Sequence, residues 1–223
     1  MDAPAGPPAE RTPPPGPPAD PAVPAEWPAV LAALEEARAR GFVGVGQGVD
    51  ALAEHARGFV GPIAEASRVL DLGSGGGVPG LVVAALLPDA TVTLLDVSVG
   101  RTDWLRRVVG RLGWGDRVEV VTGRAEVLAH DEVWRGRQDA VVARSFAPPL
   151  VTAEVAAPFL RVGGRLIVSE PPQRDPARWP ADALDELGLR ALPWPDPRYA
   201  LLEAVASPRS EIPRARVVRG RTS

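Results

Sequence analysis

A glycine-rich loop between two apolar segments is the feature that most constrains this chain. The loop covers residues 73–80, between a predicted strand at residues 68–72 and a helix predicted over residues 79–87. Glycine lets a backbone come close to a ligand, and the start of a helix offers free N–H groups. Ligands of open α/β sheets bind at the carboxyl ends of the strands, where such a loop lies. The loop therefore predicts an α/β protein that holds a nucleotide-like cofactor beside its first strand.

Short apolar runs alternate with helical stretches along the rest of the chain. Further strands are expected at residues 91–95, 118–121, 139–143, 165–169, 189–192 and 199–206, and helices at residues 102–112 and 149–160. Strands of continuous Val and Leu character between helices are typical of a parallel sheet covered on both faces. We therefore predict a Rossmann-like, mostly parallel sheet of seven strands with a C-terminal antiparallel pair.

The sequence before the sheet divides into two parts. Residues 1–27 are dominated by Pro and Ala and cannot bury enough apolar surface to offset their ordering entropy, which predicts a disordered tail. Residues 28–64 predict a helical segment. Its first helix is expected at residues 28–40, and its second is capped by Asp50 and runs to about residue 63.

The most basic part of the chain follows the predicted sheet domain at residues 65–206. This C-terminal segment, residues 207–223, sets one glutamate, Glu211, against five arginines: Arg209, Arg214, Arg216, Arg219 and Arg221. Such a segment can follow a phosphate backbone or can be a solvated tail. The sequence leaves both readings open.

Composition excludes several classes of protein. The chain has no Cys, which excludes disulfides, a Cys-based zinc site and a thiolate nucleophile. Its net charge of −3 argues against a protein that coats nucleic acid over its whole surface, but it allows a local basic patch. We see no apolar run long enough to span a membrane and no signal peptide. We therefore expect a cytoplasmic monomer without a metal.

Two cofactors fit the glycine loop. Asp96, at the end of the second predicted strand, suits a carboxylate that accepts hydrogen bonds from a ribose diol. The segment GGGVPG at residues 75–80 also satisfies the dinucleotide fingerprint, so NAD(P) remains an alternative. S-adenosylmethionine (SAM) is favoured because Asp71 would suit a sulfonium or amino group and would be unwelcome beside a pyrophosphate. Pro79 inside the turn and the short length of the chain also favour SAM over NAD(P). Asp71 can alternatively bind the loop's own N–H groups.

Five motifs stand out near the predicted strand ends: DLGSGGGVPG at residues 71–80, LLD at 94–96, RTDWLR at 101–106, GRAE at 123–126 and ARSFA at 143–147. Together they resemble the bacterial RsmG (GidB) family of 16S rRNA guanine-N7 methyltransferases, over about residues 67–170. The resemblance implies a class I SAM-dependent methyltransferase fold with SAM as cofactor. It also implies 16S rRNA or the small ribosomal subunit as partner, with direct in-line methyl transfer to guanine N7.

The resemblance also implies site residues, although it assigns no catalytic residue. The positions expected to bind the cofactor are Gly73, Ser74, Gly75, Gly77, Val78, Asp96, Ala125, Glu126 and Arg144. Of these, Ala125 and Glu126 would border the adenine. Arg144 would lie near the methionine end and can pair with a carboxylate or an RNA phosphate. Phe146 is a second substrate-binding candidate, because it can stack on a base, or it can be a core residue.

The chain departs from the family pattern outside these motifs. In the N-terminal helices only His55 is comparable; it can be a pocket residue, but we favour a place on a helix surface. After the fifth strand, SEPP at residues 169–172 replaces the usual Lys-Gly. Two alternatives therefore stay open: a methyltransferase for a small molecule, and a SAM-binding paralogue without rRNA activity.

Overall fold

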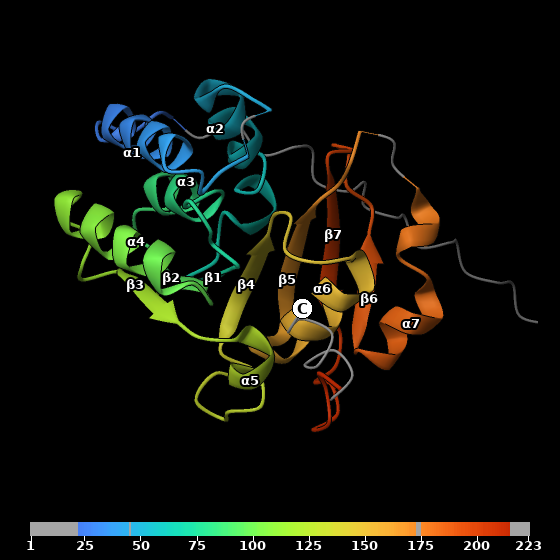
Figure 1. Cartoon of the computed structure of the whole chain (residues 1–223). Helices are drawn as coiled ribbons and strands as arrows, with labels where there is room; N and C mark the ends of the chain where they lie inside the picture. The colour runs from blue at the N-terminus through green and yellow to red at the C-terminus, as the bar shows by residue number, and fades with distance from the viewer. Residues whose placement is uncertain (1–21, 45, 173–174, 215–223) are drawn as a thin grey trace, which may run out of the picture.

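The computed structural model describes residues 22–44, 46–172 and 175–214 and contains one seven-stranded sheet (Figure 1). Its strands are β1 Arg68–Leu72, β2 Thr91–Asp96, β3 Val118–Thr122, β4 Gln138–Ala143, β5 Leu160–Ser169, β6 Leu189–Leu192 and β7 Tyr199–Ala204. They lie in the order β3-β2-β1-β4-β5-β7-β6. Strand β7 runs antiparallel to its neighbours β5 and β6, and the other pairs are parallel. The predicted sheet, including its C-terminal antiparallel pair, is confirmed.

Helices cover both faces of the sheet. They are α1 Trp27–Ala39, α2 Val49–Arg57, α3 Gly80–Leu86, α4 Val99–Arg111, α5 Ala125–Leu128, α6 Pro149–Ala156 and α7 Ala181–Glu186. Short 3-10 turns lie at η1 Gly61–Ile63, η2 Ala157–Phe159 and η3 Pro176–Arg178. Helices α1 to α4 gather at the left of the sheet in Figure 1, and buried residues of α5, α6 and α7 pack on the opposite face.

The buried residues of the strands alternate between these two layers. In β1, Val69 packs in the cluster that contains α1 to α4, and Leu70 packs in the cluster that contains α6 and α7. In β4, Val142 and Val141 divide in the same way. Successive side chains of a strand point to opposite faces, so a strand that is apolar throughout must be covered twice. The N-terminal helices belong to the first of these two cores.

Several predicted boundaries are wrong. The second helix begins after an N-cap at Gly48, with Asp50 in its first turn, and it ends at Arg57. Beyond Arg57 the Phe59 N–H donates to the Ala56 carbonyl, and the His55 carbonyl, which an α-helix would pair with Phe59, accepts from the Tyr199 hydroxyl. The helix that begins at residue 149 ends at Ala156 and is followed by a 3-10 turn. Strand β5 then begins at Leu160 through an irregular register with β4.

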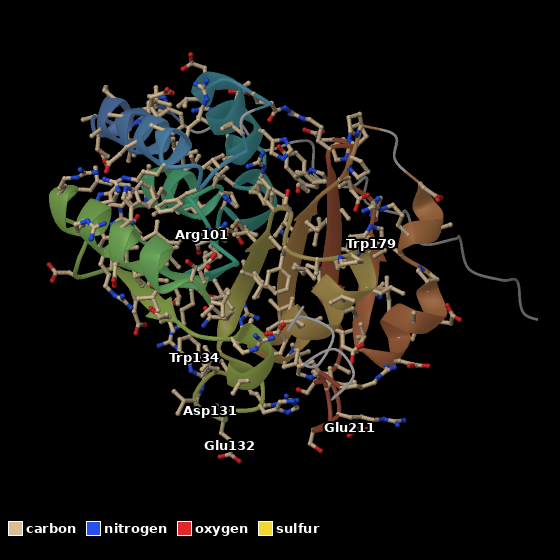
Figure 2. All side chains as sticks on the ribbon, in the orientation of Figure 1. Arg101, Asp131, Glu132, Trp134, Trp179 and Glu211 are labelled. Atoms are coloured by element: carbon tan, nitrogen blue, oxygen red, sulfur yellow. The ribbon has the colours of Figure 1, made fainter. Side chains whose placement is uncertain are left out.

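The described part of the C-terminal segment lies away from the carboxyl ends of the parallel strands. Strand β7 is antiparallel, so the chain leaves it at the amino edge of the sheet. There the guanidinium of Arg135 donates to backbone carbonyls at Pro208, Arg209 and Ile212. Figure 2 shows Glu211 at the bottom of the view, on the same side as Asp131 and Glu132. Arg216, Arg219 and Arg221 lie outside the described residues, as do residues 1–21 of the predicted tail.

No helix in the part of the chain that the structure describes is long and apolar enough to cross a membrane.

Candidate functional site

The glycine loop is held in place by carbonyl and carboxylate oxygens of the neighbouring strand. The N–H groups of Gly73 and Ser74 donate to the Leu95 carbonyl, each at 2.9 Å. The carboxylate of Asp96 accepts from the Gly75 N–H and the Ser98 N–H, both at 2.8 Å. These bonds fix the loop at the carboxyl ends of β1 and β2 before any ligand is present, as a preorganised binding site requires.

Position 73 requires a glycine because of its backbone conformation and because of a neighbouring side chain. Its φ of +77° lies in the left-handed region, which side chains disfavour. An added Cβ would also lie 2.6 Å from the ring of Phe146. The loop after β1 and the loop after β4 therefore touch at this point, and a larger residue would separate them.

Asp71 lies beneath the loop with only 1% of its surface exposed. Its Oδ2 accepts a hydrogen bond from the Gly80 N–H at 3.0 Å, and burial raises the pKa of its carboxyl to about 7. The hydroxyl of Ser74 donates to the Asp71 backbone carbonyl. Of the two roles that the sequence allows for Asp71, the structure shows the one in which it binds the loop's own N–H groups.

A first cavity of about 150 Å³ opens where β1, β2 and β3 end. Its wall contains Leu95 and Asp96 at the end of β2, Val97 after it, Gly123 to Glu126 after β3, and Gly73, Arg101, Ser145 and Phe146. Asp96 and Glu126 are both almost fully buried. The Arg101 Nη1 lies 3.8 Å from Asp96, and the Arg124 Nη2 lies 4.0 Å from Glu126. Two carboxylates in one small cavity suit a ligand that carries hydroxyl and amino donors.

The structure brings only some of the predicted cofactor residues to this cavity. Those that line it are Gly73, Asp96, Ala125 and Glu126. Four others shape the loop behind it: Ser74 and Val78 are buried, Gly75 donates to Asp96, and Gly77 has a φ of +84°. Arg144, the ninth predicted position, does not line this cavity but a second one. Six lining residues were not among the predicted cofactor positions, although all but Val97 lie within the five motifs: Leu95, Val97, Arg101, Gly123, Arg124 and Ser145. Their signal is their position next to the ends of β2, β3 and β4, which places most of them at the ligand edge of the sheet.

A second cavity of about 580 Å³ shares Ser145 and Phe146 with the first. Its charged and protonatable lining residues are His55, Arg144, Glu170, Arg178 and Arg198. Arg144 and Phe146, the two predicted substrate-binding residues, therefore meet here. Ser145 between them has a φ of +54°, an unusual value for a residue with a side chain. Strained backbone of this kind occurs at functional sites more often than elsewhere.

The arginines of the second cavity differ in their partners. Arg198 holds Asp196 through Nε at 3.0 Å and Nη2 at 2.7 Å, and the Arg178 Nε lies 3.1 Å from Glu170. Arg144 is half-buried and makes no hydrogen bond or ion pair with the residues that the structure describes. Because a guanidinium removed from water without an opposite charge costs free energy, Arg144 is suited to a negatively charged ligand.

His55 lies in this cavity, so the favoured expectation of an open helix surface is wrong and the alternative of a pocket residue is the one that the structure shows. Its ring stacks on Tyr199 with centroids 5.1 Å apart, and the Tyr199 hydroxyl donates to the His55 carbonyl. Burial lowers the pKa of His55 to about 4, helped by the positive charges of Arg144 and Arg198. The imidazole is therefore neutral near pH 7.

Comparison with known proteins shows which family the chain resembles. A family model described as GidB, rRNA small subunit methyltransferase G, matches residues 59–171. The chain is 42% identical over 106 residues to the ribosomal RNA small subunit methyltransferase G of Rubrobacter xylanophilus, which covers 48% of this chain and 40% of that protein. It is 37% identical over 151 residues to the protein of the same name from Synechococcus sp., which covers 67% and 54%. The chain thus spans about half the length of the curated relatives it matches.

The fold is also that of known methyltransferases. The SAH-bound methyltransferase of Podospora anserina superimposes with a TM-score of 0.56 at 17% identity, over 79% of this chain and 87% of that one. At this identity the likeness concerns the fold alone. It confirms the predicted class I methyltransferase fold, with its Rossmann-like, mostly parallel sheet.

Proposed function

The chain belongs to the GidB family of rRNA small subunit methyltransferases, and on that premise we propose that it transfers a methyl group from SAM to N7 of a guanine in 16S rRNA. One observation carries the proposal from the structure. Two cavities meet at Ser145 and Phe146: the first holds two carboxylates and two arginines, and the second holds three arginines and one carboxylate. Such a pair suits a cofactor on one side and a nucleic acid on the other.

The residues of the first cavity fit SAM. Asp96 still has lone pairs beyond those used by Gly75 and Ser98, and these suit the ribose hydroxyls. Ala125 and Glu126 form the adjoining wall, where an acidic group can accept from the adenine amino group. Ser74, Gly75, Gly77 and Val78 would act through the shape of the loop, and Gly73 would border the ligand directly.

The proposed reaction depends on alignment of the base with the methyl group more than on proton transfer by the protein. When bound, SAM supplies an electrophilic methyl group on its sulfonium sulfur; the N7–carbon bond forms as the sulfur–carbon bond breaks, and the sulfur keeps the bonding electron pair. Guanine N7 has an exposed lone pair, so no strong base is needed. The part of this chain is to hold the base in line with the methyl group and to exclude water. Phe146 lies at the junction of the two cavities, where it can stack on the base.

The arginines also favour RNA over a small neutral molecule. Arg144, Arg178 and Arg198 line the acceptor side, whereas a neutral metabolite would favour a closed pocket with uncharged walls. A SAM-binding paralogue without activity would share the first cavity, and only an assay of transfer separates it from an enzyme.

The proposal includes where and how the protein works. It would act in the cytoplasm as a monomer without a metal, on 16S rRNA alone or in the small subunit. The tail at residues 1–27, the helical segment at 28–64, the methyltransferase domain at 65–206 and the basic segment at 207–223 would be its parts. Light scattering and an assay in the presence of a chelator test the monomer and the absence of a metal.

A methylation assay tests the function. Purified protein and radiolabelled SAM are incubated with 16S rRNA and with small ribosomal subunits from a strain that lacks this modification, and the labelled base is mapped. We expect label at N7 of a single guanine. Arg209→Gln, on the exposed amino edge, is the matched control and should retain full transfer. Label on another base, or SAM binding without transfer to either RNA, contradicts the proposal.

A further inference from the structure

The second cavity brings together side chains from three separate parts of the chain. His55 comes from α2, Arg144 from the loop after β4, and Arg198 from the loop before β7. The end of β4 and the start of β7 lie at the same edge of the sheet, because β7 is antiparallel to β5 and β5 is parallel to β4. These residues therefore face one space of about 580 Å³, which is of the size that ligand sites have.

The cavity has more positive than negative charge. Arg198 is balanced by Asp196, and Arg178 by Glu170. The charge of Arg144 has no such balance among the described residues. A planar guanidinium binds the oxygens of a phosphate through paired hydrogen bonds, so an oxyanion is the ligand that would complete this arrangement.

His55 is fixed in position beside these arginines. Its ring stacks on Tyr199, and its other neighbour is the edge of Phe59 at 5.9 Å. The groups that act on its charge are Arg144 and Arg198, which disfavour the imidazolium, and Asp196, which favours it. An anion bound among these groups would oppose the effect of the arginines. It would therefore also favour a second donor N–H on the imidazole.

We propose that Arg144, His55 and Arg198 form a phosphate-binding site in the second cavity, which takes an RNA phosphate next to the methylated base. The identity of the RNA rests on the proposed function, but the site itself does not. We choose phosphate over the carboxylate of the cofactor because all three residues line the second cavity, whereas the carboxylates suited to a ribose line the first.

Binding of phosphate should be coupled to protonation of His55. A bound anion makes the imidazolium more favourable, and by linkage a protonated His55 binds phosphate more tightly. Inorganic phosphate is a suitable probe, because at mildly acidic pH it is mainly a monoanion and so has the charge of an RNA phosphodiester.

An NMR titration of the two histidines of the full chain tests the site. The signals of His55 and His130 are followed against pH with and without inorganic phosphate, at constant ionic strength. His130 is an internal reference, since its Nε2 lies 3.0 Å from the Pro213 carbonyl in the C-terminal segment. We expect phosphate to raise the pKa of His55 by about 1 or more and to leave His130 unchanged. Arg144→Gln should abolish the change, and Arg144→Lys, which keeps the charge, should retain part of it.

Several outcomes would overturn the site. These are no change at His55, an equal change at both histidines, or an undiminished change in Arg144→Gln. An identical change with SAM alone and none with phosphate would assign the site to the cofactor carboxylate. Should Arg144→Gln misfold, Arg198→Gln replaces it, with a reduced response expected and an undiminished one contradicting the site. A normal His55 response without methylation of any RNA would uphold the site and reject the proposed function.

Discussion

The two cavities differ in how far their polar and charged groups are paired within the protein. Around the first, carboxylates already pair with N–H groups of the backbone: Asp96 binds those of Gly75 and Ser98, and the Oδ2 of Asp71 binds that of Gly80. Around the second, Arg144 faces the cavity without an ion pair among the described residues. The first cavity is therefore built to hold its shape, and the second is built to gain an anionic ligand. The family model ends at residue 171, so it covers the loops of the first cavity but leaves Arg178 and Arg198 outside.

The largest effect should come from breaking the first cavity at Asp96. Asp96→Ala removes the acceptor of two backbone N–H groups in a buried place, so we expect a loss of about 3 kcal/mol in the free energy of unfolding. Denaturant unfolding measures this loss. A change below about 1 kcal/mol would mean that the loop does not depend on the carboxylate.

The stability of the fold should depend on pH through Asp71, which lies beneath the glycine loop. Burial raises the pKa of Asp71 from 3.8 to about 7 in the folded protein, so the folded state binds this proton more tightly than the unfolded state. The added stability is fully present below pH 3.8 and is lost as pH rises through about 7. Compared with Asp71→Asn, the native protein should lose about 2 kcal/mol between mildly acidic and neutral pH.

This comparison with Asp71→Asn cancels other titrations. His55 acts in the opposite direction, because its pKa is lowered from 6.5 to about 4 and its contribution is lost as pH falls between these values. Both proteins contain His55, so only Asp71 contributes to the difference. Parallel stability curves for the two proteins would show that Asp71 is ionised when folded.

A smaller effect is expected where the two cavities meet. Phe146→Ala removes a ring that can stack on a base, which should raise KM for the RNA about tenfold. Phe146→Leu keeps the contact with the Gly73 loop and separates packing from stacking. Steady-state kinetics with RNA at saturating SAM measures both. Equal kinetics for Phe146→Ala and the native protein would remove Phe146 from the acceptor site.

The smallest effect is expected at the amino edge of the sheet. Arg209 is exposed and only 4.0 Å from Glu211, an arrangement that contributes little to stability. Arg209→Gln should change neither transfer nor melting temperature. A clear loss of RNA affinity in this variant would mean that the described C-terminal segment contacts the RNA.

The sequence predicted the sheet well because its strands carry a local signal. The apolar run before the glycine loop gave β1 with its observed bounds, Arg68–Leu72, and β6 was also placed correctly. The two short helices α5 and α7 were missed, since they are too brief to show a period. The end of α2 was also missed, because there the His55 carbonyl accepts from the hydroxyl of Tyr199, a residue far along the chain.

The residues of the two cavities also differ in how well they could be predicted from the sequence. Asp96 and Gly73 could be selected from their distance to strand ends, since one loop and one neighbouring strand suffice to place them. His55 could not, because the residues that share its cavity, Arg144 and Arg198, are brought near α2 only by the folded sheet. The described C-terminal residues were the reverse case. Their charge suggested RNA, but the direction of β7 takes them to the opposite edge of the sheet.

The most direct test measures SAM affinity and transfer rate together in two variants. Calorimetry gives the Kd for SAM, and single-turnover assays at saturating SAM give the rate of transfer to 16S rRNA. Asp96→Asn should weaken SAM binding about tenfold or more, because a charged acceptor for the ribose is lost. Arg144→Gln should leave the Kd for SAM within about twofold and lower transfer about 100-fold, because it removes the proposed charge pair with an RNA phosphate. If Arg144→Gln weakens SAM binding as much as Asp96→Asn does, the division into a cofactor cavity and an acceptor cavity is wrong.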